Sequence, residues 1–276
     1  MARRIARALT IAGSDSGGGA GIQADLKTFA ALGVFGTCAV TALTAQNTRG
    51  VSGIHPVPAD FVELQIAAVM EDIGADAAKT GMLANREIIL AVARAVERYG
   101  IERLVVDPVL VSQHGAALLA ADALDALVAA LLPRALVVTP NTEEAGRIAG
   151  VEVSDRASQQ RAAREIARLG PRYVLIKGGH LPDADSATDL LYDGHDFEEL
   201  TRARVATMHT HGTGCTLSAA IAAYLALGQP PERAIAHAKE FVTRAIEHGL
   251  DVGTGQGPVD PMWARGTPEQ QESDSE

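Results

Sequence analysis

A glycine-rich turn that leads into a helix carries the first candidate for chemistry. It reads His209-Thr-His-Gly-Thr-Gly-Cys-Thr-Leu-Ser218, and an Ala-rich apolar run follows it. Gly212 and Gly214 let the backbone approach an anion, and the first N–H groups of the helix would point at that anion. Cys215 stands on the first turn, where the helix dipole lowers a thiol pKa and favours a base or nucleophile. The alternative is a glycine-rich loop followed by a core helix with one buried cysteine.

A second glycine-rich segment, Gly13-Ser-Asp-Ser-Gly-Gly-Gly-Ala-Gly21, follows the first strand-like run. It contains neither the Gly-x-Gly-x-x-Gly of dinucleotide-binding proteins nor the Gly-Lys-Ser/Thr of a P-loop. Its serines also lack the flanking glycines of a serine-hydrolase elbow. We therefore predict a flexible loop whose backbone closes over a small ligand, with a merely tight connection as the alternative.

Two residues at the ends of other strands suit a flat heterocycle. Gln46 offers a donor and an acceptor side by side, which complements the edge of an aminopyrimidine. Met82 can pack on an aromatic ring through its soft thioether. A surface amide and a core-filling methionine are the corresponding structural alternatives.

Four polar residues at the ends of later strands suit phosphate and magnesium chemistry. Asp107 follows a buried run, as an Mg²⁺ ligand does, although it could equally cap the next helix. Asn141 and Glu144 would lie on one side of a helix start, either as an Mg²⁺–water shell or as a capping box. Lys177 ends a strand before two glycines, where an ammonium would suit a nucleotide phosphate.

Charge and composition exclude several functional classes. A net charge of −10 argues against a nucleic-acid surface, and no apolar run is long enough to cross a membrane. Cys38 and Cys215 are too few for a disulfide framework. His180, His209 and His211 do not form a zinc pattern. We expect a soluble cytoplasmic protein whose partner is a small molecule.

A repeated alternation of strands and helices must position these residues. The predicted strands are Ala8–Ala12, Cys38–Thr44, Ala75–Thr80, Leu104–Asp107, Leu136–Thr139 and Tyr173–Lys177. Helical patterns cover Gly21–Leu32, Ala59–Ile73, Arg86–Tyr99, Ala116–Leu132, Asn141–Ile148, Arg156–Leu169, Thr213–Leu227 and Pro231–Gly249. This alternation predicts an α/β fold, with a mostly parallel sheet covered on both faces.

The sheet is expected to have a small antiparallel edge. Asp189–Tyr192 and Arg204–Met208 are predicted as its strands, around a turn at Asp193-Gly-His-Asp196. No linker divides the chain, so we predict a single domain over residues 1–260. Residues 261–276 form a polar, acidic tail that we expect to be disordered.

Taken together, these motifs closely resemble the hydroxymethylpyrimidine/phosphomethylpyrimidine kinases of thiamine biosynthesis. The resemblance runs from about Ala8 to Val259, in order and with family-like spacing. The motifs that carry it are the Gly13–Lys27 segment, Ala45-Gln-Asn-Thr-Arg-Gly-Val51, Thr80-Gly-Met-Leu83, Thr139-Pro-Asn141 with Glu144, Lys177-Gly-Gly-His180 and His211-Gly-Thr-Gly-Cys-Thr-Leu-Ser218. Each motif alone is weak, whereas the combination is highly specific.

The resemblance implies a ribokinase-like fold and a homodimer. It also implies two successive ATP-dependent phosphorylations, of 4-amino-5-hydroxymethyl-2-methylpyrimidine and then of its monophosphate. Carried over by position, the substrate-binding residues would be Gln46 at the aminopyrimidine edge and Gly13, Ala20, Met82 and Val109 around the ring. These roles are expectations from the family.

The other carried-over roles concern ATP and Mg²⁺. Asn141, Glu144 and Asp107 would organise Mg²⁺–ATP, with Asp107 and Glu144 acting on the metal through water, and Lys177 would serve the nucleotide. Gly212, Gly214 and Cys215 would form the catalytic anion hole, and most sugar kinases of the superfamily carry Asp in place of this cysteine.

Two alternatives stay open. The chain could be a pyridoxal/pyridoxine or mixed vitamin kinase, but related enzymes that accept pyridoxal can carry a second cysteine in the loop after Asp107. The segment 109–115 has none, which argues against efficient pyridoxal phosphorylation. The chain could also be a non-catalytic pyrimidine- or nucleotide-binding protein, which the intact set of polar residues disfavours.

Overall fold

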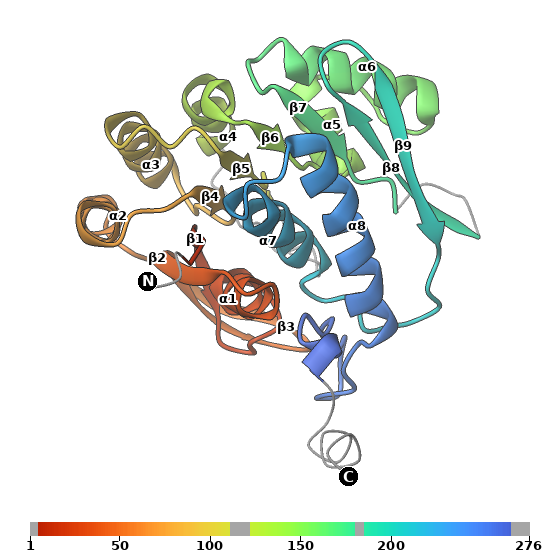
Figure 1. The fold of residues 1–276 in the computed structure, drawn as a ribbon, viewed down its shortest axis with the longest axis horizontal. Coiled ribbons are helices and arrows are strands. Elements are labelled where there is room, and N and C mark those ends of the chain that lie inside the picture. The colour runs from red at the N-terminus through yellow and green to blue at the C-terminus, as the bar shows by residue number, and fades with distance from the viewer. Residues whose placement is uncertain (1–4, 111–121, 180–184, 266–276) are drawn as a thin grey trace.

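A nine-stranded sheet in the order β3-β2-β1-β4-β5-β6-β7-β8-β9 forms the centre of the computed structural model (Figure 1). The structure describes residues 5–110, 122–179 and 185–265. The strands are β1 (Arg7–Asp15), β2 (Phe35–Asn47), β3 (Gly50–Pro56), β4 (Ala77–Thr80), β5 (Leu104–Val106), β6 (Val137–Val138), β7 (Tyr173–Ile176), β8 (Ser186–Tyr192) and β9 (Phe197–Ala203). The pairs from β2 through β7 are parallel, and β3, β8 and β9 join antiparallel at the two edges.

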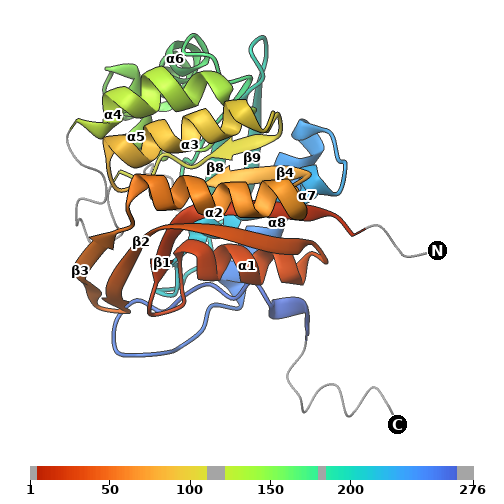
Figure 2. The same cartoon turned by 90° about the vertical axis from the view of Figure 1, so that its left-hand side faces the viewer.

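Helices cover both faces of this sheet (Figures 1 and 2). They are α1 (Gly21–Ala31), α2 (Ala59–Asp72), α3 (Arg86–Arg98), α4 (Ala123–Ala126) with the turns Leu127–Leu131 and Leu132–Arg134, α5 (Thr142–Ala149), α6 (Arg156–Ala167), α7 (Thr213–Ala226), α8 (Pro231–Glu247) and the short turn Trp263–Arg265. None of the described helices is both long enough and apolar enough to cross a membrane.

Alternation along the central strands divides the core into two layers. Leu104 and Val106 of β5 pack in one cluster with α2 to α6, whereas Val105 packs in the other with α1, α7 and α8. Successive side chains of a strand point to opposite faces, so a strand covered on both faces must be apolar throughout. The predicted mostly parallel sheet with helices on both faces is thus confirmed.

The two edges of the sheet differ from the prediction. β8 is confirmed around Asp189–Tyr192, but its partner is β9, and the strand predicted over Arg204–Met208 is wrong. β3 was not predicted. Leu200 is the one buried residue of β9, and β3 buries none, so neither edge strand has the apolar alternation by which strands are recognised.

Two other predictions reach beyond the described residues. The helix expected over Ala116–Leu132 is described from residue 122 onward, as α4 and the two turns that follow it. The expected disorder of the acidic tail concerns residues 261–276, of which 266–276 lie outside the described part of the chain.

Candidate active site

One cleft of about 600 Å³ lies where the carboxyl ends of the parallel strands meet the start of α7. Ligands of open α/β sheets bind at this end of the strands. Every residue predicted for the site lines this cleft: Gly13, Ala20, Gln46, Met82, Asp107, Val109, Asn141, Glu144, Lys177, Gly212, Gly214 and Cys215. The structure therefore brings together all the candidates, although their separate roles stay predictions.

The glycine-rich turn before α7 has the backbone that an anion site needs. Gly212 is the N-cap residue at φ +81°, a left-handed conformation that favours glycine. A Cβ atom there would lie 1.9 Å from the carbonyl oxygen of Gly19, so the two glycine-rich segments touch backbone to backbone. Among the described residues, no side chain caps α7. The start of this helix is therefore left to a ligand or to water.

The thiol of Cys215 does not have the lowered pKa that its place on the helix predicts. Burial raises its pKa to about 11, although the nearby Lys79 ammonium and the Gly21 backbone N–H act in the opposite direction. The expectation from the helix dipole alone is therefore wrong, because desolvation of the thiolate outweighs it. At neutral pH Cys215 is therefore mainly a thiol.

Lys79 and Asp25 form a buried ion pair beside the cysteine that the sequence analysis missed. The Lys79 side chain is 0% exposed, and its Nζ lies 2.9 Å from Asp25 Oδ2. The Thr10 hydroxyl donates a hydrogen bond to the same carboxylate, at 2.6 Å. A pair this deep is costly to build and is disrupted by removal of one partner. Because the two residues lie 54 positions apart, no local pattern reveals them.

A second ion pair joins two predicted residues at the other end of the cleft. Lys177 Nζ lies 2.9 Å from Asp107 Oδ1 and 3.9 Å from Glu144 Oε2. Burial would raise the pKa of Asp107, but the cations of Lys177 and Lys79 outweigh it and hold that pKa below its usual range. Asp107 is thus an ionised carboxylate. The cleft therefore contains a negative carboxylate and the positive Lys177 ammonium within hydrogen-bond distance of each other.

Asn141 and Glu144 cap α5 reciprocally. Asn141 N–H donates to Glu144 Oε2 at 2.8 Å, and Glu144 N–H donates to Asn141 Oδ1 at 2.8 Å. The structural alternative, a capping box, is therefore confirmed. Burial raises the pKa of Glu144 to about 7, with Lys177 opposing the rise. A carboxyl group that titrates near neutral pH beside a cation remains available for metal or proton chemistry.

Met82 lies in the cleft next to the first glycine-rich segment. A Cβ atom on Gly13 would lie 3.1 Å from Met82 Sδ, so glycine makes room for the thioether. The Thr41 hydroxyl donates to the Met82 carbonyl at 2.6 Å and fixes the backbone there. Met82 is 8% exposed, so it fills core and also lines the cleft. The two interpretations of this residue are compatible.

Asp15 is a further residue that the sequence analysis did not single out. It lies at the end of β1, 3% exposed, and accepts a hydrogen bond from His211 Nε2 at 2.9 Å. Its carboxylate also accepts the N–H groups of Gly17, Gly19 and Ala20, at 2.8, 3.1 and 2.9 Å. The available signal was an acidic residue inside a glycine-rich loop, whose exposed N–H groups need an acceptor.

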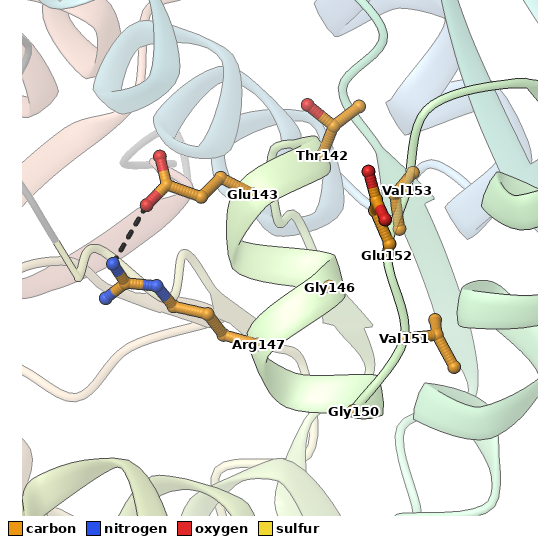
Figure 3. Close-up of a pocket in the computed structure, with 8 residues that line it drawn as sticks. All are labelled: Thr142, Glu143, Gly146, Arg147, Gly150, Val151, Glu152 and Val153. Atoms are coloured by element: carbon orange, nitrogen blue, oxygen red, sulfur yellow. Dashed lines mark ion pairs between the residues drawn. The ribbon is translucent and has the colours of Figure 1, made fainter.

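A second, shallower hollow lies beside α5 and the segment after it (Figure 3). Its charged side chains include Glu143 and Arg147, which pair with each other at 2.9 Å. Their charges are thus satisfied within one helix face, and none of the described residues that line the hollow is a cysteine or a histidine. The cleft at the strand ends is accordingly the candidate active site.

Comparisons with known proteins agree with this geometry. The family model described as phosphomethylpyrimidine kinase matches residues 15–260. The chain is 48% identical over 255 residues to the hydroxymethylpyrimidine/phosphomethylpyrimidine kinase of Bacillus subtilis, covering 92% of this chain and 94% of that protein.

Two solved structures are also similar. The pyridoxal kinase of Staphylococcus aureus, in complex with AMP-PCP and pyridoxal, superposes with a TM-score of 0.88 at 40% identity, over 95% of this chain and 96% of that one. The phosphomethylpyrimidine kinase of Clostridium difficile 630 gives a TM-score of 0.78 at 43% identity, over 88% of this chain and 100% of that one.

Proposed function

The chain belongs to the phosphomethylpyrimidine kinase family and is a phosphotransferase, and from this premise we propose how its cleft phosphorylates hydroxymethylpyrimidine and then phosphomethylpyrimidine. The family and the ribokinase-like fold predicted from the motifs are thereby confirmed. The observation that carries the proposal is the convergence of every predicted residue on one cleft. ATP is the phosphoryl donor, as the AMP-PCP complex of the S. aureus kinase supports.

The proposal divides the cleft into two ends. Gln46 reads the aminopyrimidine edge, and Met82 packs against the ring with Gly13, Ala20 and Val109 around it. Lys177 serves the nucleotide phosphates at the other end, and the start of α7 between them receives the transferred phosphoryl group. Val205, Val242 and Ile246 line the same cleft and offer an apolar surface for the adenine base.

The two steps make different demands on Cys215. In the first step the hydroxymethyl oxygen bonds to the γ-phosphorus, and the bond from that phosphorus to the bridging oxygen of ADP breaks. The hydroxyl proton goes to Cys215 in the fraction of the enzyme that carries this residue as a thiolate, a fraction that grows with pH. In the second step the attacking phosphate oxygen is already ionised, so no base is required. The N–H groups at the start of α7 and the Lys177 ammonium neutralise charge in both steps.

Mg²⁺ fits the donor set at the nucleotide end. Mg²⁺ is usually held by one or two carboxylates together with substrate phosphates and water, and Asp107 and Glu144 supply two carboxyl groups. In the described parts of the chain, no three His, Cys, Asp or Glu side chains gather into a metal site of their own. Mg²⁺ would therefore be held jointly with ATP, whose phosphate charge it neutralises when bound.

The pKa of Glu144 predicts a pH dependence of Mg²⁺ use. Because burial raises this pKa to about 7, the carboxylate form grows as the pH rises from 6 to 8. We expect the KM for Mg²⁺, measured at saturating ATP, to fall roughly tenfold over this range. Glu144→Gln preserves the capping box, which accepts glutamine at this position, and should lose the dependence. An unchanged dependence in that variant would remove Glu144 from the metal site.

The test of the proposed function is ADP release with a panel of substrates. We expect release that requires Mg²⁺ and hydroxymethylpyrimidine. The pyridoxal kinase fold of the S. aureus neighbour favours pyridoxal as a second candidate substrate, and the same panel includes it. A preference for pyridoxal would replace the proposal, whereas binding of hydroxymethylpyrimidine without any ADP release would favour a non-catalytic binding protein.

We also propose that the chain forms a homodimer and acts in the cytoplasm, where ATP is supplied. Phe61 and Leu64 lie three residues apart on α2 and are 54% and 62% exposed. Leu43 and Ile54 of the adjoining β2–β3 ribbon are exposed as well. Several large apolar side chains exposed in one region are typical of a protein interface.

Loss of this apolar surface should separate the subunits. Light scattering of the wild type is expected to give about twice the chain mass of 28.7 kDa. The double variant Phe61→Glu/Leu64→Glu places two charges on the exposed face of α2 and should give the mass of one chain. Its circular dichroism spectrum serves as the control for folding. A folded variant that keeps the double mass would exclude this surface as the interface.

A further inference from the structure

Asp15 determines where His211 carries a hydrogen. The Asp15 carboxylate accepts three backbone N–H groups besides the contact of 2.9 Å from His211 Nε2. Burial would raise the pKa of Asp15, but these donors outweigh it and lower that pKa, so the group is ionised. An ionised carboxylate can only accept, so His211 Nε2 must carry the hydrogen.

The histidine is fixed as firmly as the carboxylate. His211 is 7% exposed, and its backbone is held at both polar groups. The backbone N–H of His211 donates to the Gly257 carbonyl at 3.1 Å, and its backbone carbonyl accepts from the Val259 N–H at 3.0 Å. A Cβ atom on Gly19 would lie 2.5 Å from His211 Cδ2, so the glycine-rich loop closes over the imidazole. The Nε2–H group therefore has one direction, toward Asp15 and the adjoining end of the cleft.

The side-chain amide of Gln46 lies beside the same ring nitrogen. The amide nitrogen lies 3.4 Å from His211 Nε2, which would set two N–H groups against each other. The oxygen and nitrogen of an amide are nearly equal in size, so the partners decide which way it points. Because Nε2 of His211 carries its hydrogen toward Asp15, it has no lone pair with which to accept from an NH₂ group, so the oxygen of Gln46 is favoured on this side.

Thr44, on the other side of the amide, favours the same orientation of the Gln46 side chain. Its hydroxyl lies 3.0 Å from the Ser14 carbonyl and 3.1 Å from the other amide atom of Gln46. A hydroxyl has one hydrogen, and a carbonyl can only accept it. Once Thr44 donates to Ser14, it can only accept from Gln46, which requires the NH₂ group on this side. The two neighbours thus favour one orientation independently.

We propose that Asp15, acting through His211, fixes the Gln46 amide with its oxygen toward the histidine and its NH₂ toward Thr44, and that this makes the site select a 4-aminopyrimidine against its 4-oxo counterpart. The backbone of Gln46 supports a fixed side chain, because its N–H donates to Ser16 Oγ at 2.8 Å and its carbonyl accepts from that hydroxyl at 2.7 Å. Asp15 is a positioning residue in this account.

The preference for the 4-amino substrate follows from the order of the hydrogen-bond donor and acceptor along the Gln46 amide. It rests on the proposed function, in which Gln46 contacts the pyrimidine. The outer edge of the amide presents an acceptor on the histidine side and a donor on the threonine side. When the 4-amino group of hydroxymethylpyrimidine lies on the histidine side, that group and the neighbouring ring nitrogen offer a donor and an acceptor in the matching order. The 4-oxo analogue offers a carbonyl and a ring N–H, the reverse order. Both hydrogen bonds would then be replaced by clashes of like groups.

The experiment compares kcat/KM for hydroxymethylpyrimidine and for its 4-oxo analogue, 5-hydroxymethyl-2-methylpyrimidin-4-one, on each enzyme preparation. The ratio of the two values does not depend on the folded fraction, so partial misfolding leaves it unchanged. We expect the wild type to prefer the amino substrate by at least about 100-fold. In Asp15→Asn the amide can donate as well as accept, and it no longer forces a hydrogen onto His211 Nε2. Its ratio should fall by about tenfold to a hundredfold.

Three further variants separate the possible outcomes. Asp155→Asn exchanges the same groups at the N-cap of α6, where the Asp155 carboxylate accepts a hydrogen bond from the Ser158 N–H, and it should keep the wild-type ratio.

Thr44→Val should lower the ratio several-fold even where Asp15→Asn does not fold. Gln46→Leu should abolish the preference, and a wild-type ratio in Gln46→Leu would refute the proposed role of Gln46 itself. A lost preference in Gln46→Leu with a wild-type ratio in Asp15→Asn would overturn the inference about Asp15 alone.

Discussion

Replacing Cys215 with alanine is expected to slow the phosphorylation of hydroxymethylpyrimidine by about 10²- to 10⁴-fold, the usual contribution of a general base. The phosphorylation of phosphomethylpyrimidine should change by less than about tenfold, because its ionised nucleophile needs no base. The measurement is single-turnover kinetics on each substrate separately, at saturating Mg²⁺–ATP. Any loss of packing in the variant affects both steps, so the ratio of the two losses isolates the proton transfer.

A serine at the same position distinguishes the base from the packing. Cys215→Ser retains nearly the same shape and can still form hydrogen bonds, but its hydroxyl is a poor base. It should therefore be as slow as the alanine variant in the first step. Equal losses in both steps, or a serine variant as fast as the wild type, would leave Cys215 as a packing residue.

The pH dependence of the first step gives a second readout of the same role. Because burial raises the pKa of Cys215 to about 11, its thiolate fraction grows with pH, about tenfold per unit between pH 7 and 10. The wild-type rate of the first step should rise with this slope, and the second step should lack the Cys215 contribution. The slope should disappear from the first step in Cys215→Ala.

Replacing Gly214 with alanine is expected to impair both phosphorylations by about 10²- to 10³-fold, the usual cost of a lost anion-stabilising donor. A Cβ atom at Gly214 would lie 3.3 Å from Lys177 Nζ and 3.7 Å from Asp107 Oδ2. The methyl group would therefore stand where the account places the transferred phosphoryl group. The measurement is kcat for each step, together with the KM for ATP.

Gly53→Ala is the matched control for this substitution. Gly53 lies on β3 and is not among the residues that line the cleft. Among the described residues, a Cβ atom there would meet Ala45 Cβ alone, at 3.9 Å, an ordinary contact. This variant should retain wild-type rates. If Gly214→Ala were as active as Gly53→Ala, the start of α7 would not be the anion hole. Opposite effects on the two steps would contradict a shared phosphoryl site.

Local patterns in the sequence predicted the central part of the fold well. Strands such as Leu104–Val106 are apolar on both faces, and helices such as α3 carry a buried stripe, so their periodicity is strong. The edge strands β3 and β9 have little to bury, and their placement depends on pairing with a neighbour. No local pattern records such pairing, which explains why β3 was missed and β9 was misplaced.

The site was predicted to a similar extent. The predicted residues lie at the ends of strands or at the start of a helix, so the topology alone brings Asp107, Asn141 and Lys177 together. The contacts that the sequence analysis missed join distant positions: Lys79 with Asp25, and Asp15 with His211. The pKa of Cys215 was predicted in the wrong direction. The place of Cys215 at a helix start can be recognised from the sequence, whereas the burial that raises its pKa depends on how distant segments pack around it.

The central claim is that one cleft carries out both phosphorylations, and a single-turnover experiment tests it most directly. Enzyme in excess over hydroxymethylpyrimidine is mixed with Mg²⁺–ATP, and the monophosphate and diphosphate are resolved over time. We expect the monophosphate to appear first and then to be converted to the diphosphate by the same enzyme. A reaction that stops at the monophosphate, or that transfers no phosphoryl group to the pyrimidine, would contradict it.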